Sequence, residues 1–436
     1  MTENVMAEKA KRAAKETNLR HRAVYVGDNL PVLRCTDGES VDLVYMDPPF
    51  NTGRGFPFRR DRQKGDKDAD MAFEDTWKLA DIHWDEEVAL AEQYPSALAV
   101  IDALSEVNGD AWRAYLIYMG VRLAEIRRIL NPTGGVYYHC DPAMSHGVKL
   151  LMDAIFGRKN FRNEIVWWYS WGVHTDKYWN KKHDIILYYA KDAKKVFFDG
   201  KRARVPYREG SVMTQDPKWN KKYCAEGKLP EDVFDIPTIN SMSKERTGYP
   251  TQKPLALLKR IIAASGNKGD FVLDPFCGCG TSCLSAEWLE RRWAGIDVGK
   301  KAADLVVKRL LKESDAMFIP SAEEVELFRK SPKRTDLAGL RTANEILRPR
   351  LYKMQGGVCE GCETKVEIRF MDFDHIIAEA RGGQDIDGNI QLLCRQCNGI
   401  KGARGMTYLR KRIAERRKNE AMTKWREERR QKARRG

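Results

Sequence analysis

Several features that define other classes of protein are missing from this 436-residue sequence. No apolar run approaches the roughly 20 residues that span a membrane, and the first residues, MTENVMAEKAKRAAKETN, lack the apolar centre of a secretion signal. The ten cysteines include two C-x-x-C pairs, which indicates thiols or metal ligands rather than a disulfide framework. Internal repeats are absent as well. We therefore expect a cytoplasmic globular protein without membrane contact.

The net charge of +14 is concentrated at the end of the chain. Residues 401–436 hold 15 Lys or Arg against 4 Glu, so the preceding residues are close to neutral. Because the last 29 letters before the final glycine, TYLRKRIAERRKNEAMTKWREERRQKARR, contain neither Gly nor Pro, we expect a basic helical tail over residues 407–436. Such tails are usually only solvated, and the binding of nucleic-acid phosphates is the functional alternative that this clustered positive charge offers.

Short strand-like runs alternate with helical segments along most of the chain. The runs occupy residues 23–28, 41–47, 135–140, 165–170, 184–191, 271–276 and 293–298. Helical apolar spacing is clearest over residues 112–130. This alternation predicts an α/β fold with a Rossmann-like, mostly parallel sheet. Two stretches interrupt it: residues 51–110, expected to be a loop or helical excursion, and the basic, aromatic residues 192–245, expected to be an inserted surface lobe.

The stretch VDLVYMDPPFNTG ends an apolar, strand-like run with an acid and two prolines. Asp47 should lie at the carboxyl end of a buried parallel strand, which is where open α/β sheets bind ligands. Pro48 and Pro49 fix the backbone, so the Asp47 carboxylate and the Pro48 carbonyl form a rigid pair of acceptors beside Phe50. This arrangement suits a flat group that carries an NH2, although Asp-Pro-Pro also occurs in ordinary turns.

A second strand end, DFVLDPFCGCGT, repeats this design with glycines. Gly278 and Gly280 would allow the backbone to approach a ligand closely. Asp297 follows Gly280 by 17 residues and ends the next strand-like run, where a carboxylate can accept hydrogen bonds from ribose hydroxyls. The turn is neither G-x-G-x-x-G nor G-x-x-x-x-G-K-[ST], so by itself it is also compatible with a plain strand-to-helix turn.

Together these motifs resemble the DNA amino-methyltransferases, which transfer a methyl group from S-adenosylmethionine to an exocyclic base nitrogen. The family's D-P-P-[YF] and D-P-F-x-G-x-G-T motifs are complete at residues 47–50 and 274–281, and TQKPLALLKRII resembles the segment before the cofactor strand. The catalytic motif precedes the cofactor motif, which is the order of the permuted β class. The resemblance covers roughly residues 20–315.

The resemblance implies a role for each matched residue. Asp47, Pro48, Pro49 and Phe50 would hold and stack on a base extruded from the duplex. Those expected around the cofactor are Asp28, Thr251, Lys253, Asp274, Phe276, Gly278, Gly280, Thr281 and Asp297. For Asp28, a plain solvated strand-end acid is an equal alternative. Adenine N6 is the expected target and cytosine N4 stays open, and residues 192–245 are the candidate target-recognition region.

A small module over residues 337–406 follows a predicted helical linker, residues 316–336. Cys359, Cys362, Cys394 and Cys397 form two pairs with the ligand chemistry of a closed tetrahedral Zn²⁺ site. The motifs DHI, GG and N-x-Q-x-L-C-x-x-C-N-x-x-K-G around them resemble an HNH nuclease of the ββα-metal type.

That second resemblance implies the residues of a nuclease site. Asp374 and Asn398 would bind Mg²⁺ or Mn²⁺, His375 would activate water, and Asn389 would staple the turn. HNH-like zinc modules can also serve only to bind DNA, and this alternative stays open.

The whole sequence therefore predicts a site-specific DNA methyltransferase fused to an HNH endonuclease. It would act on double-stranded DNA in restriction-modification or in phage and host DNA modification, inside a prokaryotic or phage-infected cell, and a homodimer is compatible with it. The alternative is a methyltransferase whose terminal module only binds DNA or recruits a partner.

Overall fold

The computed structural model describes residues 16–57, 71–82, 84–170, 174–207, 226–317, 325–337 and 341–435. The chain divides into two compact units, of which the first comprises Met1–Ile82 and Leu90–Lys333 and the second His83–Ala89 and Arg334–Gly436. The first unit holds both of the strand-end motifs, and the second holds the two cysteine pairs. In the part of the chain that the structure describes, no helix has the length and apolar content needed to cross a membrane.

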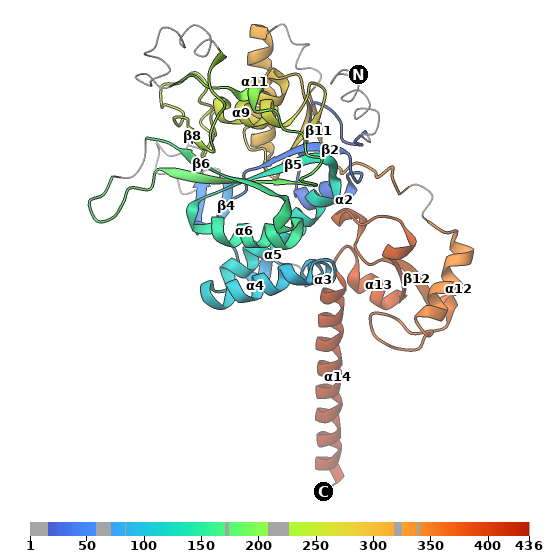
Figure 1. Cartoon of the computed structure of the whole chain (residues 1–436). Coiled ribbons are helices and arrows are strands. Elements are labelled where there is room, and N and C mark those ends of the chain that lie inside the picture. The colour runs from blue at the N-terminus through green and yellow to red at the C-terminus, as the bar shows by residue number, and fades with distance from the viewer. Residues whose placement is uncertain are drawn as a thin grey trace, which may run out of the picture. The chain divides into compact units, whose positions relative to one another are not determined.

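Among the described residues, the first unit contains a nine-stranded sheet in the order β11-β1-β10-β9-β2-β5-β7-β6-β8 (Figure 1). Its strands are β1 Ala23–Val26, β2 Val41–Met46, β5 Leu130–Cys140, β6 Phe161–Trp168, β7 His183–Ala190, β8 Val233–Asp235, β9 Phe271–Asp274, β10 Arg292–Asp297 and β11 Glu326–Phe328. Each neighbouring pair is parallel except the two that include β7. The predicted mostly parallel α/β sheet is confirmed.

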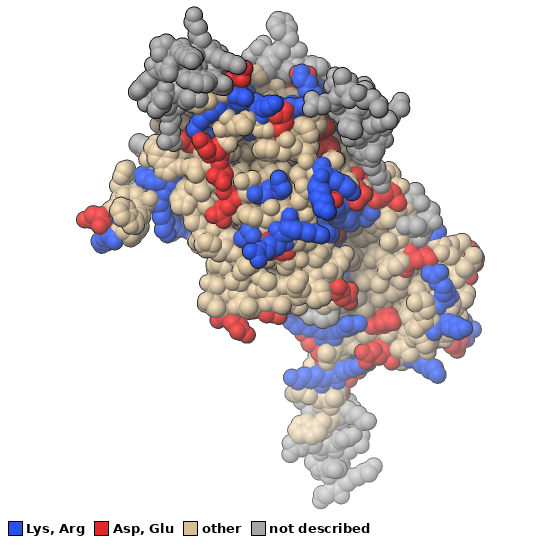
Figure 2. All heavy atoms as spheres, in the orientation of Figure 1, with Lys and Arg blue, Asp and Glu red and all other residues tan. Residues whose placement is uncertain are grey.

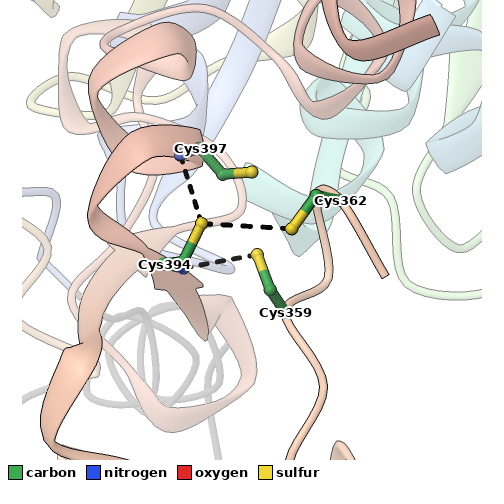
Figure 3. Close-up of side chains that lie close together, drawn as sticks. All are labelled: Cys359, Cys362, Cys394 and Cys397. Carbon is green, nitrogen blue, oxygen red and sulfur yellow. Dashed lines mark hydrogen bonds between the residues drawn. The ribbon is translucent and has the colours of Figure 1, made fainter. Parts of the chain in front are cut away.

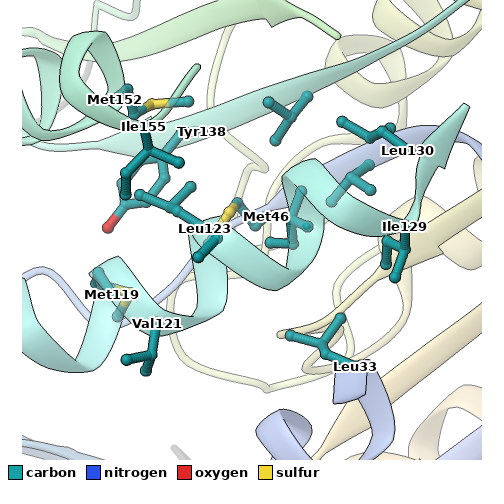
Figure 4. Close-up of a cluster of buried hydrophobic side chains, with 14 of the residues drawn as sticks. Leu33, Met46, Met119, Val121, Leu123, Ile129, Leu130, Tyr138, Met152 and Ile155 are labelled. Atoms are coloured by element: carbon teal, nitrogen blue, oxygen red, sulfur yellow. The ribbon is translucent and has the colours of Figure 1, made fainter. Parts of the chain in front are cut away.

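Helices cover both faces of the sheet and bury its side chains on each side. The first core is formed with α2 Asn29–Cys35, α4 Pro95–Asn108, α5 Asp110–Ile129 and α6 Pro142–Phe156, and the second with α9 Leu255–Ser265, α10 Thr281–Trp288 and α11 Lys300–Met317. Figure 4 shows part of the first core, where Met46 of β2 lies near Leu123 of α5. Along β2, Val44 faces the first core and Tyr45 the second, which explains why this strand is a continuous apolar run.

Parallel pairing brings three strand-end acids to one edge of the sheet. Asp47 directly follows β2, while Asp274 and Asp297 end β9 and β10. The register pairs Gly295 of β10 with Asp274, and β9 also pairs with β2. Since these strands run in the same direction, their carboxyl ends form a common ligand-binding edge.

The excursion between Asn51 and Asp110 contains more structure than the sequence predicts. Helix α3 Trp84–Gln93 and α4 fit the helical alternative, but β3 Arg54–Pro57 and β4 Met71–Asp75 also form an antiparallel hairpin. The helix expected over residues 112–130 is confirmed as α5.

The helical linker predicted over residues 316–336 is wrong in part. Helix α11 is described as far as Met317 and residues 318–324 lie outside the described residues, but Glu326–Phe328 forms a strand, β11, which pairs with β1 at the edge of the sheet. Three residues carry too little periodic pattern to predict a strand. Their extended conformation comes from the open hydrogen-bonding edge that β1 offers.

The second unit has a ββα arrangement. The antiparallel strands β12 Met371–His375 and β13 Ile390–Cys394 are followed by α13 Arg395–Lys401, and α12 Asn344–Met354 packs beside them. The basic tail expected over residues 407–436 is helical, since α14 spans Met406–Arg435. Its first turns contribute Leu409 and Ile413 to a small core.

Candidate active sites

A cavity of about 370 Å³ lies at the carboxyl edge of the sheet and joins both strand-end motifs. Its volume is within the usual range of small-molecule sites, roughly 300–1,000 Å³. The residues of the two motifs that line it are Asp47, Pro48, Pro49, Phe50, Asp274, Pro275, Phe276, Cys277, Gly278, Cys279 and Thr281. Asp28, Thr251, Lys253 and Asp297 also line it, whereas Gly280 does not. The structure thus brings the predicted catalytic and cofactor residues to one space, and their individual roles stay predictions.

The Asp47 carboxylate is paired with an ammonium group that is distant in sequence. Lys253 Nζ lies 2.9 Å from Asp47 Oδ1 and 2.7 Å from Oδ2, and the Lys253 side chain is only 8% exposed. The same Nζ lies 5.2 Å from the centre of the Phe50 ring. The sequence places Lys253 near the cofactor, but the structure joins it directly to the predicted catalytic acid. The pairing holds the Asp47 carboxylate in place next to the Phe50 ring.

Asp75, which the sequence analysis missed, holds the backbone of the segment after Pro49. Its buried carboxylate accepts hydrogen bonds from the backbone N–H groups of Phe50, Asn51 and Thr52 at 3.2, 2.6 and 2.8 Å. It also accepts from the Thr52 hydroxyl at 2.6 Å and from the Trp77 indole at 3.2 Å. The sequence gives no sign of this role, because Asp75 is one of many charged residues between residues 51 and 110. Its partners become clear only when the fold places β4 beside the segment that follows Pro49.

The Phe50 ring packs against a buried histidine that is held by two hydrogen bonds. His139 is fully buried, and its ring stacks on Phe50 with centroids 5.8 Å apart. Its Nδ1 lies 2.8 Å from the Tyr45 hydroxyl and its Nε2 lies 3.1 Å from Asp184 Oδ2. Both ring nitrogens therefore have partners, which makes His139 a structural residue that sets the position of Phe50.

The carboxylates of Asp274 and Asp297, at the ends of β9 and β10, both have pKa values that burial raises. Asp274 is buried and accepts from the Phe276 N–H at 2.9 Å and from the Ser282 hydroxyl, and burial raises its pKa to about 7. Asp297 accepts from the Gly278 and Gly299 N–H groups at 2.9 and 2.7 Å, and burial raises its pKa to about 6. Each Asp297 oxygen keeps a lone pair for a ligand hydroxyl.

The glycine turn itself is closely packed. Gly278 and Gly280 have φ values of +49° and +72°, a region that side-chain-bearing residues rarely adopt. A Cβ on Gly280 would lie 2.7 Å from Val306 of α11, so this glycine serves packing behind the cavity rather than its lining. Cys277, Cys279 and Cys283 are buried here, as packing residues.

Asp28 has a structural role at the wall of the cavity. It caps α2 by accepting from the Leu30 N–H at 3.0 Å, and it pairs with Arg122 at 2.6 Å, while its side chain stays 54% exposed. Arg122 is buried, also donates to Asn29 Oδ1, and stacks 3.2 Å from the centre of the Tyr118 ring. The exposed part of Asp28 leaves a ligand contact open.

The four paired cysteines of the second unit converge on one point (Figure 3). Their sulfur atoms all lie within 4.8 Å of one another, and Cys362 Sγ is 4.0 Å from Cys394 Sγ. Tetrahedral zinc with Zn–S bonds of ~2.3 Å separates its sulfur ligands by ~3.8 Å. The cluster therefore fits a structural Zn²⁺ ion.

The predicted divalent-ion site looks different. The buried Asp374 carboxylate accepts from Gln391 Nε2 at 2.7 Å and is paired with Lys401 Nζ at 3.1 Å. Lys401 is fully buried and also donates to the His375 carbonyl at 2.7 Å. No hydrogen bond joins the described side chains of Asn398 and Asp374. The Lys401 ammonium thus already balances the charge of the Asp374 carboxylate, which weighs against a divalent ion bound by that carboxylate in this arrangement.

Asn389 and His375 lie on either side of the loop between β12 and β13. Asn389 accepts from the Ile377 N–H at 2.9 Å and donates to the Ile377 and Gln384 carbonyls at 3.0 and 2.9 Å, which staples the loop between β12 and β13. His375 Nε2 is buried without a hydrogen bond among the described residues, and it lies 3.4 Å from Asp385 Oδ1. The Asp385 carboxylate is therefore close enough to orient the His375 ring.

The fold and the two motif-lined sites are those of a DNA-modifying enzyme with an appended nuclease-type domain. Comparison with known proteins identifies the family. A family model of DNA methylases of the N6/N4 type matches residues 41–308, and a model of HNH endonucleases matches residues 359–404. The chain belongs to the N6/N4 DNA methyltransferase family and carries a C-terminal HNH domain.

Curated relatives resemble the first part of the chain. The DNA adenine methyltransferase YhdJ of Escherichia coli is 30% identical over 312 residues, which cover 71% of this chain and 88% of YhdJ. The type II methyltransferase M.ScaI of Streptomyces caespitosus is 34% identical, with coverage of 68% and 83%. Among solved structures, the cytosine-N4-specific PvuII DNA methyltransferase matches with a TM-score of 0.42 and 13% identity, covering 70% of this chain and 92% of that one. That structural likeness is too remote to support an inference.

Proposed function

We propose that the protein methylates the exocyclic amino group of adenine, at N6, in double-stranded DNA, with S-adenosylmethionine as the methyl donor. The observation that carries this proposal is the single cavity that both strand-end motifs line. An extruded base and a cofactor would meet there, as enzymes that act on bases require. Its YhdJ relative is a DNA adenine methyltransferase, in agreement with adenine as the target.

Asp47, Pro48 and Phe50 would position the base. The Asp47 carboxylate and the Pro48 carbonyl accept the two amino hydrogens, which draws the nitrogen lone pair out of conjugation with the ring. Phe50 stacks on the base and is itself supported by His139. Lys253 can remain paired with Asp47, because each carboxylate oxygen accepts more than one hydrogen bond. Rate acceleration would then come mainly from orientation and exclusion of water.

The cofactor motif would hold S-adenosylmethionine, which supplies a methyl group on a positively charged sulfur when bound. Asp297, fixed by the Gly278 and Gly299 N–H groups, would accept from the ribose hydroxyls. Phe276, Gly278 and Thr281 would line the cofactor, and Asp274 and Thr251 line the same cavity. For Asp28 we retain both a contact to the adenine of the cofactor and its helix-capping role.

The proposal is tested with purified protein, isotopically labelled S-adenosylmethionine and unmethylated plasmid DNA, followed by analysis of the digested nucleosides. We expect labelled N6-methyldeoxyadenosine, and we expect Asp47→Ala to lose it while the chain stays folded. The control Asp102→Ala, at an exposed position of α4, should retain it. Labelled N4-methyldeoxycytidine would instead make cytosine the target, and no labelled nucleoside from the wild type would overturn the proposal.

Target recognition is proposed for residues 192–245, of which 208–225 lie outside the described residues. The first part of this region lies by the start of β5, because the Phe197 N–H donates to the Thr133 carbonyl. The last part returns toward the cavity, where Tyr249 and Thr251 line the wall. We place the base-reading contacts in that returning part, within or after β8.

We further propose that the HNH domain cleaves DNA with Mg²⁺ or Mn²⁺, so that one chain both modifies and cuts in the manner of restriction-modification. His375, which ends β12 next to the loop that Asn389 holds, supports a base role, whereas the Asp374–Lys401 pair supports the alternative, a zinc module that only binds DNA or recruits a partner. Cys359, Cys362, Cys394 and Cys397 would hold a Zn²⁺ ion that keeps the module folded. We assign domains to residues 20–315 and 337–406, with 407–436 as the basic tail.

Cleavage is tested on supercoiled plasmid with either divalent ion. We expect nicks or breaks from the wild type and from His146→Ala, at an exposed position of α6, but not from His375→Ala. Equal cleavage by wild type and His375→Ala, or none by either, would favour the binding module. Removal of residues 337–436 would then weaken DNA binding and leave methylation of saturating DNA intact.

A further inference from the structure

The connection between β6 and β7 leaves the sheet at the same edge as the methyltransferase cavity. Strand β7 is antiparallel to both β5 and β6, so β6 runs in the direction of β5 and β2. The carboxyl end of β6, Trp168, therefore lies at the edge where Asp47 follows β2. In Figure 1 this hairpin projects beyond the ends of the strands.

The end of this hairpin exposes aromatic rings. We define the hairpin tip as residues 174–182, with the sequence HTDKYWNKK. Trp179 is 96% exposed and Tyr178 is 58% exposed. Exposure of an almost complete indole is costly in water and indicates a surface that a partner covers.

The charges of the tip indicate which partner that is. Lys177, Lys181 and Lys182 stand against one acid, Asp176. Basic and acidic side chains are visible on the projecting hairpin at the left of Figure 2. Aromatic faces interleaved with ammonium groups match the alternation of bases and phosphates in nucleic acid.

The tip is ordered by its own side chains. The Thr175 N–H donates to Asn180 Oδ1 at 2.7 Å, and the Lys177 N–H donates to Thr175 Oγ1 at 3.2 Å. These bonds fold residues 175–180 into a turn, and Trp179 lies within it. A partner would therefore meet a shaped element, which lowers the entropy lost on binding.

The base of the hairpin is tied to the residues beneath the predicted base-stacking ring. The Tyr169 N–H donates to the Lys182 carbonyl at 2.9 Å, and the Tyr169 hydroxyl donates to Asp184 Oδ1 at 3.1 Å. Asp184 in turn lies 3.1 Å from His139 Nε2, and His139 stacks on Phe50. The hairpin thus has a fixed geometric relation to the catalytic segment.

We propose that the hairpin tip binds duplex DNA beside the extruded base, with Trp179 stacking on or wedging between bases and Lys177 and Lys181 at the phosphates. This inference rests on the proposed DNA methylation and adds to it a contact surface outside residues 192–245. Opening of the base stack by an inserted ring is an established way to ease extrusion of a neighbouring base. A polar side chain in place of Trp179 could neither stack on a base nor insert between bases.

The first test compares Trp179→Ala with Trp179→Phe, which keeps a stacking ring, and with the control Trp288→Ala. Trp288 is 38% exposed and ends α10, at the opposite edge of the sheet. Affinity for a fluorescent duplex cut from unmethylated plasmid, S-adenosylmethionine affinity, and the KM and kcat of methyl transfer are measured. Because loss of one base-stacking ring weakens binding by roughly tenfold, we expect Trp179→Ala to raise the DNA Kd and KM about tenfold with unchanged cofactor affinity.

The two control variants sharpen this result. Trp179→Phe should lie within about twofold of the wild type, because a phenyl ring still stacks. Trp288→Ala should match the wild type in both DNA constants. Trp179→Ala with wild-type DNA Kd and KM would overturn the hairpin proposal and leave methylation standing. A wild type that neither binds nor methylates the DNA would overturn both.

The second test concerns the lysines. The double substitution Lys177→Gln/Lys181→Gln should reduce the salt dependence of DNA binding by about one unit of slope for each phosphate that is no longer neutralised. The control Lys159→Gln/Lys268→Gln removes two lysines that are exposed at the other edge of the sheet, before β6 and β9. Equal slopes for the two double variants would contradict the proposed phosphate contacts.

Discussion

Single buried carboxylates decide the geometry of the methyltransferase site at the residue scale. Asp75 gathers three consecutive backbone N–H groups of the catalytic segment, while Asp47 is paired with Lys253. A carboxylate is acceptor-only and can satisfy several donors at once, so it can hold a loop that has no regular secondary structure. The proposed role of Asp47 therefore depends on Asp75, which positions the catalytic segment without contacting the base.

Asp75→Asn should impair turnover without impairing cofactor binding. The amide turns one acceptor into an NH2 that faces backbone donors, so the segment from Phe50 to Thr52 loses its clamp. A displacement near 1 Å at a catalytic group costs ~10²-fold in rate. We expect a kcat lower by that order and an S-adenosylmethionine Kd within about twofold of the wild type. Asp102→Asn, at an exposed acid of α4 outside the cavity, is the matched control, and an unchanged kcat for Asp75→Asn would refute the clamp.

The raised pKa of Asp274 predicts a pH dependence of stability. Its pKa is about 7 in the folded protein and 3.8 in the unfolded chain, so the folded state binds the proton more tightly. The stabilisation is fully present below pH 3.8 and is lost as the pH rises through about 7. Between pH 5 and pH 8 this group should cost the cofactor-free protein ~3 kcal/mol of unfolding free energy. Denaturant unfolding of the wild type and of Asp274→Asn at pH 5 and pH 8 measures this cost. An equal loss of unfolding free energy in the two proteins between these pH values would contradict the prediction.

At the element scale, the turn between β9 and α10 joins ligand binding to helix packing. Gly278 faces the cavity and donates to Asp297, whereas Gly280 allows α11 to approach through Val306. Both glycines have positive φ, so the turn depends on a conformation that few other residues adopt. Two glycines of one motif therefore have different roles: Gly278 lines the cavity, and Gly280 allows α11 to pack closely.

Gly280→Ala should destabilise the first unit. A Cβ would lie 2.7 Å from Val306 Cγ2, and a left-handed conformation costs a non-glycine residue ~1–2 kcal/mol. We expect a loss of about 2 kcal/mol or more of unfolding free energy, read by urea denaturation. Gly266→Ala is the control, since its Cβ would meet only ordinary contacts of 3.7 Å or longer. Equal stability of the two variants would show that the turn is not constrained as described.

At the scale of the whole molecule, the two units differ in how they are held together. The first unit has two extensive cores on either side of its sheet. The second has one small core in which Cys359 and Cys397 are themselves members. A small module with so little apolar burial usually needs a metal or disulfides to be stable. Zinc at the cysteine cluster would meet that need.

Removal of zinc should unfold the second unit and spare the first. Calorimetry of the full chain should show two transitions, of which a chelator or Cys359→Ser abolishes only one. Metal analysis should give one zinc per chain for the wild type and for Cys35→Ser, whose cysteine is buried in α2. A protein without zinc that keeps both transitions would show that the cluster is not a structural metal site.

The sequence by itself determined the features that depend on local pattern. Apolar runs closed by acids and glycines predicted the strands that end near Asp47, Asp274 and Asp297, and the order of the motifs predicted the permuted class. Strand ends of parallel strands must share an edge, so the shared site followed from the same reasoning. The cysteine spacing likewise predicted the cluster that the structure assembles.

Only the tertiary structure decided which distant groups meet. Lys253 joins Asp47 across 206 positions, Asp75 reaches the loop from an unpredicted hairpin, and β11 adds to the sheet because β1 has an open edge. Lys401 reaches Asp374 in the same way. Such contacts are determined by tertiary packing and by the need of each buried charge for a counter-charge or hydrogen bonds. Both depend on residues that are distant in the sequence, so the local pattern does not predict them.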